Sequence, residues 1–246
     1  MSDASPATGE DPSPAESLDP GDVATDPAAR GVVYRTLSVC FDNPSEDLHA
    51  RLLDGRLADG LREAIQASAL TVSVPDLDPE GNRRTLSGRY NRLFALGQTV
   101  VTDRTDGSVE SEGPAVSLYA SSHREDATWA EINADLARAY EYYGLGVDET
   151  EREHHDNLRL QLEFAGYLAR REALGEADAA RARRDFLDRH LKPFADSLRE
   201  ALREADDGVY AAFGEFLAAF VNADRADLAD RLDAGEDTAD SAEVAW

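Results

Sequence analysis

The sequence predicts an all-α protein, and three observations carry this prediction. Apolar residues recur along most of the chain at the three- and four-residue spacing of an amphipathic helix. Proline and glycine follow several of these runs where helices end, as at Pro44, Gly97 and Gly144. A β-branched stretch at residues 71–74 is too short and isolated to start a sheet. We therefore expect one domain, a bundle of roughly eight to ten helices.

The individual helices follow from the apolar spacing and its end signals. Ser45 followed by Asp47 and Leu48 is typical of a helix cap, and Pro193 inside a helical run predicts a kink. Residues 98–124 are rich in Gly, Ser and Thr, so we expect a long irregular loop there. The expected helices, in chain order, cover about residues 30–43, 45–69, 86–96, 129–143, 158–169, 187–205 and 210–221.

The two ends of the chain differ from its middle in composition. Residues 1–29 hold five of the ten prolines, seven acidic residues and no basic residue before Arg30. Such a segment cannot bury enough apolar surface to order itself, and it has no export signal, so we expect a disordered tail on a cytoplasmic protein. Residues 222–246, with eight acidic and two basic residues, are expected to form a solvated acidic tail. The predicted folded domain is residues 30–221.

The charge balance excludes some classes of partner. The chain has 50 acidic and 25 basic residues, a net charge of −25, which disfavours nucleic acid and anionic membrane surfaces. Lys192 is the only lysine, and this usage together with the acidity predicts a halophilic, haloarchaeal-type source. No apolar run reaches the roughly 18 to 20 residues of a membrane span. The single cysteine, Cys40, excludes an internal disulfide and a cysteine-based zinc site.

Enzyme motifs are few. The sequence has no phosphate-binding glycine loop before a lysine, no dinucleotide fingerprint and no nucleophile elbow. His154, His155 and Asp156, with Glu163 nearby, have the ligand types of a divalent metal site. Adjacent histidines point about 100° apart on a helix, which favours a hydrogen-bonding cluster at a helix start over a metal site. A metal-dependent hydrolase using these four residues stays an alternative; otherwise we expect no catalytic residue, no metal and no cofactor.

Three segments, in this order, resemble a known family. They are Tyr90-Asn-Arg-Leu-Phe94, then Pro114-Ala-Val-Ser-Leu-Tyr119, then the run from His155 to Phe164. This order is similar to that of the TorD/DmsD/NarJ family of redox-enzyme maturation chaperones, over about residues 30–221. The sequence departs from the family pattern at Asn157, where histidine is common, and at Gln161, where glutamate is common. Amides keep the capacity to hydrogen-bond, which favours binding over catalysis.

The resemblance implies a function. Family members bind the N-terminal leader of a molybdopterin-dependent oxidoreductase catalytic subunit, of the dimethyl sulfoxide, trimethylamine oxide or nitrate reductase type, and hold the apoenzyme until its cofactor is inserted. We expect the leader to bind in a groove between the loop 114–119 and the helix that follows residue 156. A helical accessory subunit of a redox complex is a further alternative, and the chain is expected to be a monomer or a helix-swapped homodimer. The residues expected to bind the client are Tyr90, Phe94, Pro114, Ser117, Tyr119, His155, Asp156, Asn157, Gln161 and Glu163.

Overall fold

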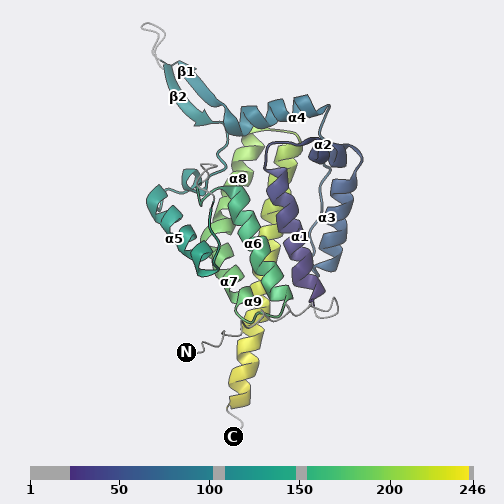
Figure 1. Ribbon diagram of the computed structural model, residues 1–246, viewed down its shortest axis with the longest axis vertical. Coiled ribbons are helices and arrows are strands. Elements are labelled where there is room, and N and C mark those ends of the chain that lie inside the picture. Colours follow the sequence, from purple (N-terminus) through teal and green to yellow (C-terminus); the bar gives the residue numbers. More distant parts are fainter. Residues whose placement is uncertain (1–22, 102–108, 148–153, 244–246) are drawn as a thin grey trace, which may run out of the picture.

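The computed structural model describes residues 23–101, 109–147 and 154–243 and confirms an all-helical single domain. Figure 1 shows the helices gathered in one body from which a hairpin and the end of the last helix project. Within the described residues, no helix is long and apolar enough to cross a membrane. The helices are α1 (Thr25–Cys40), α2 (Glu46–Leu53), α3 (Arg56–Ala67), α4 (Arg83–Tyr90), α5 (Trp129–Tyr142), α6 (Leu158–Ala173), α7 (Ala179–Phe186), α8 (Lys192–Ala205) and α9 (Val209–Glu243).

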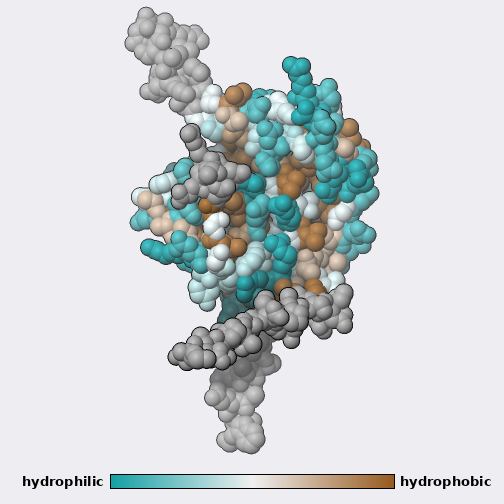
Figure 2. All heavy atoms as spheres, viewed as in Figure 1, coloured by the Kyte–Doolittle hydropathy of each residue, from teal (hydrophilic) through white to brown (hydrophobic). Residues whose placement is uncertain are grey.

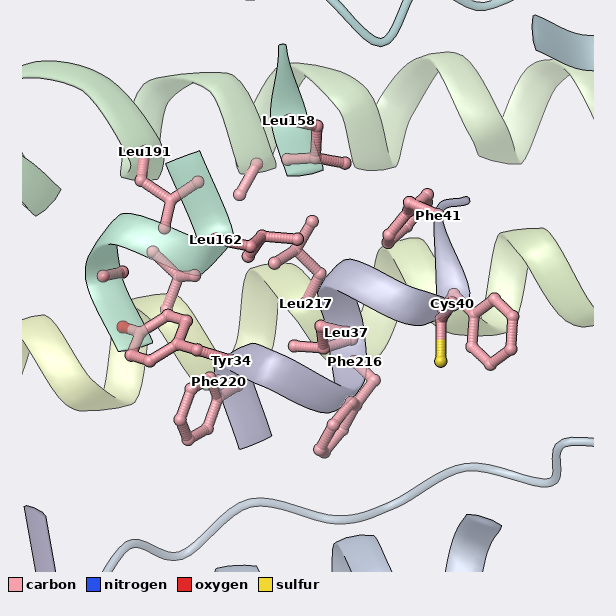
Figure 3. Close-up of a cluster of buried hydrophobic side chains, with 14 of the residues drawn as sticks. Tyr34, Leu37, Cys40, Phe41, Leu158, Leu162, Leu191, Phe216, Leu217 and Phe220 are labelled. Atoms are coloured by element: carbon pink, nitrogen blue, oxygen red, sulfur yellow. The ribbon is translucent and has the colours of Figure 1, made fainter. Parts of the chain in front are cut away.

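The centre of the bundle is the pair α1 and α6, which lie side by side in Figure 1. Two glycines allow their close approach, because a Cβ on Gly166 would lie 3.2 Å from Tyr34 Cβ and 3.3 Å from the Gly31 carbonyl oxygen. Figure 3 shows the hydrophobic core beside this contact, where side chains of α1, α6 and α9 meet. Burial of this apolar surface is the main force that holds the helices together.

The N-terminal helices correct two expected boundaries. Helix α1 begins at Thr25, five residues before the expected start at Arg30. Ser45 caps α2 as expected, with its hydroxyl accepting the Leu48 N–H at 3.1 Å. The expected single helix over residues 45–69 is wrong, because Gly55 adopts a left-handed conformation (φ 77°) and separates α2 from α3.

The expected loop over residues 98–124 is also wrong in its first half. Strands β1 (Gly97–Val101) and β2 (Val109–Pro114) form an antiparallel hairpin that projects from the body in Figure 1. Helix α4 leads into this hairpin through a π-helical turn, Asn91–Ala95. A short 3₁₀ turn, Ala120–His123, then leads toward α5. The capping box of Thr128 and Glu131 begins α5.

The second half differs at Pro193. Helix α7, which the apolar spacing did not predict, passes through a π-helical turn, Leu187–Leu191, into α8, and Pro193 lies in the first turn of α8. The expected kink is therefore a π-turn just before the proline. Proline cannot donate to the carbonyl four residues earlier, which gives this irregularity a physical reason.

The C-terminal boundary is the largest correction. Helix α9 continues through the expected tail to Glu243. Asp224 and Leu228 are fully buried, so this part of the segment belongs to the core. Asp224 accepts a hydrogen bond from Arg30 Nη1 at 2.8 Å and from the Tyr34 hydroxyl at 2.6 Å. Of the expected disordered tail, residues 1–29, residues 1–22 lie outside the described residues, and the rest is wrong from Thr25 on, where α1 begins.

Candidate functional site

The loop before α5 is joined to the start of α6 through main-chain hydrogen bonds. Tyr119 and Asn157 form an isolated antiparallel bridge. Beside it, the Leu158 N–H donates to the Leu118 carbonyl at 2.8 Å. The backbones of the two segments are therefore paired where the groove is expected.

Asp156 organises this junction from inside the protein. Its side chain is fully buried and accepts the Ser121 N–H at 3.0 Å. Its carbonyl accepts both the Ala120 N–H and Gln161 Nε2 at 3.0 Å. Its own N–H donates to Asn133 Oδ1 at 3.3 Å. These contacts give Asp156 and Gln161 a positioning role for the loop.

The two departures from the family pattern both make hydrogen bonds. Asn157 is the N-cap of α6, and its Oδ1 accepts the Arg159 N–H at 2.8 Å. Gln161 is fully buried and spans one helical turn to the Asp156 carbonyl. The amide groups therefore stabilise the start of α6, in agreement with their expected hydrogen-bonding capacity.

The side chains of the loop 114–119 have separate surroundings. Pro114 ends β2, and the Ser117 hydroxyl donates to the Ser122 hydroxyl at 2.9 Å. The half-buried Tyr119 ring lies 6.0 Å from the His154 ring. That imidazole lies 5.3 Å from Trp129, which is 53% exposed although its spacing predicted an apolar face. Tyr119 is thus part of a surface aromatic cluster.

An apolar pocket of about 220 Å³ lies next to this junction, between the C-terminal end of α5 and α6. Figure 2 shows hydrophobic surface between α5 and α6, in the same view as Figure 1. His155 stacks on Tyr140 at 5.9 Å, and its carbonyl accepts the Tyr140 hydroxyl at 3.0 Å. Burial raises the pKa of Tyr140, so its hydroxyl stays a neutral donor. The lining residues are Tyr140, Leu145, Gly146, Val147, Leu160, Glu163, Phe164, Tyr167 and Arg170.

Charged groups lie at the edge of this pocket. Glu163 Oε1 accepts a hydrogen bond from Arg35 Nη1 of α1 at 2.7 Å, and both side chains reach solvent. Further along α6, the Arg171 guanidinium lies 5.5 Å from the ring centres of both Tyr143 and Tyr167. An apolar floor with a carboxylate on its edge can bind a peptide that has apolar side chains beside a cation.

Tyr90 and Phe94 lie in a different cluster. Their rings pack against Tyr210 of α9, at 6.1 and 5.3 Å, and Phe94 also lies 6.4 Å from Phe41. Both residues are half-buried, at the end of the body that carries the hairpin. The structure therefore brings the loop residues together with residues 155–161, places Glu163 at the pocket, and leaves Tyr90 and Phe94 in a separate cluster.

The residues of the alternative metal site do not converge. The His154 ring faces Trp129, the His155 ring faces Tyr140, and Glu163 pairs with Arg35. Among the residues that the structure describes, no group of three or more His, Cys, Asp or Glu side chains could hold a metal ion. This arrangement gives the hydrolase alternative no assembled site.

The sequence prediction missed most of the pocket. Leu160, Phe164 and Tyr167 recur at helical spacing on α6, beside the buried stripe that includes Leu158 and Leu162. A helix that covers a core on one face needs only one such stripe. The second stripe was the signal in the sequence that could have identified the pocket.

The sequence is similar to known proteins over more than half of its length. The sequence model of the family described as "Nitrate reductase delta subunit" matches residues 54–200. The selenate reductase assembly chaperone protein of Thauera selenatis is 33% identical over 70% of this chain and 92% of its own length. The chlorate reductase assembly chaperone protein of Ideonella dechloratans is 28% identical over 83% of this chain and 92% of its own length. The perchlorate reductase assembly chaperone protein of Dechloromonas aromatica is 28% identical over 66% of this chain and 73% of its own length. This chain therefore belongs to the nitrate reductase delta subunit family of redox-enzyme maturation chaperones.

Proposed function

We propose that this chain is a cytoplasmic, non-catalytic assembly chaperone for the catalytic subunit of a molybdopterin-dependent reductase. The names of its relatives support this proposal, because each relative assists the assembly of a reductase of an oxidised anion. The client is then a selenate, chlorate or nitrate type of reductase.

The chaperone binds the N-terminal leader of the apoenzyme in the pocket between α5 and α6. The observation that carries this step is the apolar lining beside the Glu163 carboxylate. A leader with an arginine-bearing start and an apolar helical stretch would place apolar side chains on Leu160, Phe164 and Tyr167 and a guanidinium near Glu163. Each large apolar side chain that becomes buried contributes about 1.5–3 kcal/mol.

The other expected binding residues take supporting roles in this proposal. Asp156, Asn157 and Gln161 hold the loop and the start of α6 together beside the pocket, where His155 stacks on the lining residue Tyr140. Such second-layer contacts keep a binding surface preorganised.

The remaining expected residues have two roles. The half-buried Tyr119, with its neighbours in the surface aromatic cluster, extends the contact surface for the client. We assign Ser117 and Pro114 to the loop structure, and Tyr90 and Phe94 to packing against α9.

A binding experiment tests the proposal. The full chain is titrated with the purified catalytic subunit of a molybdopterin oxidoreductase from the same genome, once without and once with its cofactor. We expect micromolar or tighter binding to the apo form and release of the loaded form. Equal binding to both forms would instead indicate an accessory subunit of the mature complex. No binding to the apo form would contradict the proposal.

A further inference from the structure

The ion pair between Arg35 and Glu163 lies at the edge of the pocket and is not needed to hold α1 against α6. The two helices are already joined by the close contact at Gly31 and Gly166 and by the buried core. The Arg35 side chain is 59% exposed and that of Glu163 is 35% exposed, with 2.7 Å between Nη1 and Oε1. Exposed pairs of this kind contribute little to stability. The pair is therefore free to exchange partners without unfolding the protein.

We propose that Arg35 is an internal competitor for the leader's arginine and sets both the specificity and the reversibility of leader binding. This inference rests on the proposed function. In the free chaperone, Arg35 occupies the carboxylate that a leader guanidinium would use. An arriving arginine displaces Arg35, which is already largely in water and returns there at little cost.

The competitor changes how strongly the pocket distinguishes between leaders. When a leader covers the pocket, Glu163 loses water and needs a cationic partner. A leader without arginine leaves Arg35 in place, so Glu163 stays paired. A leader with arginine gains only the difference in free energy between its own ion pair with Glu163 and the Arg35–Glu163 pair that it replaces. Arg35 thus weakens the binding of arginine-bearing leaders and eases their release.

The test uses two synthetic peptides with the leader sequence of the molybdopterin oxidoreductase catalytic subunit from the same genome. One peptide is native, and in the other the arginines are replaced by glutamine. Calorimetric titration compares the full wild-type chain with Arg35→Ala. We expect Arg35→Ala to bind the native peptide about fivefold more tightly, the upper range for one exposed ion pair. We expect it to bind the glutamine peptide more weakly than the wild type does, because Glu163 is then left unpaired.

Two controls make the outcome specific. Arg203→Ala removes an arginine of nearly equal exposure (58%) that pairs with Glu215 on another surface, and it should bind both peptides as the wild type does. In a Glu163→Gln background, Arg35→Ala should have no further effect. If Arg35→Ala binds both peptides like the wild type, or both more weakly, the competitor role is wrong while leader binding stands. If neither peptide binds the wild type, the leader-binding proposal fails and this inference fails with it.

Discussion

Replacement of Asp224 by alanine should destabilise the protein strongly, although the residue lies in a segment whose composition predicts a solvated tail. The Asp224 carboxylate accepts hydrogen bonds from Arg30 and from the Tyr34 hydroxyl and lies 3.3 Å from Arg183 Nη2. All four of these side chains are fully buried. Burial by itself lowers the pKa of Arg30, but Asp26, Asp224 and Asp227 outweigh it and raise that pKa, so the guanidinium stays charged.

The size of the effect follows from what remains after the substitution. Removing one partner of a buried ion pair costs about 3–5 kcal/mol. Arg30 keeps Asp26 and Asp227, and Arg183 keeps Glu172 at 2.8 Å, so we expect a loss near the lower end, about 3 kcal/mol. For a chain of this length, such a loss lowers the melting temperature by about 6–12 °C.

Urea unfolding followed by circular dichroism measures this loss. Asp230→Ala is the matched control, because Asp230 lies on the same helix with its side chain exposed. The control should stay within about 0.5 kcal/mol of the wild type. If Asp224→Ala unfolds at the same urea concentration as Asp230→Ala, then α9 beyond residue 222 does not stabilise the core and the reasoning is refuted.

Three further predictions concern the rest of the fold. Burial lowers the pKa of His123 and of His190, so near neutral pH both imidazoles are less protonated in the folded than in the unfolded state. The free energy of unfolding should therefore fall as the pH drops through about 6.5. In the double variant His123→Gln, His190→Gln, the urea midpoint should depend less on pH between pH 5 and 8. Gly166→Val should cost about 1–3 kcal/mol of stability because the added side chain forces α1 and α6 apart. Gly60 has open space around it, so Gly60→Ala should stabilise the protein by up to ~1 kcal/mol. Equal shifts of the melting temperature in the two variants would contradict this. Asp156→Ala should cost about 2 kcal/mol and increase hydrogen exchange of the Ser121 amide, which donates to the Asp156 carboxylate, and unchanged exchange would refute the positioning role of this side chain.

Local signals at helix ends located several of the helices. Ser45 and Gly144 mark such ends, and both lie at helix boundaries in the structure. The errors arose where tertiary contacts override local composition. The acidic composition around Asp224 predicts a solvated side chain. The fold instead pairs Asp224 with Arg30, which lies 194 residues earlier in the chain. Long-range pairs of this kind leave no local periodicity.

The site prediction divides in the same way. Sequence order correctly linked the loop at Tyr119 with the segment at Asp156, since the structure pairs their backbones. It could not show that Asp156 and Gln161 face inward, because polar residues at a helix start have the same spacing whether they bind a ligand or cap the helix. Glu163 is the one expected residue that lines the pocket. Whether the ten expected residues contact a client stays a prediction, as do the halophilic source and the oligomeric state.

The most direct test of leader binding at the pocket between α5 and α6 is a calorimetric titration of Tyr167→Ala with the native leader peptide. Tyr167 lines the pocket, and removal of its ring should weaken binding at least tenfold, since the lost apolar contact is worth about 1.5–3 kcal/mol. Leu53→Ala removes an apolar side chain that is 60% exposed on α2, away from the pocket, and should bind like the wild type. Equal affinities for the two variants would contradict the account.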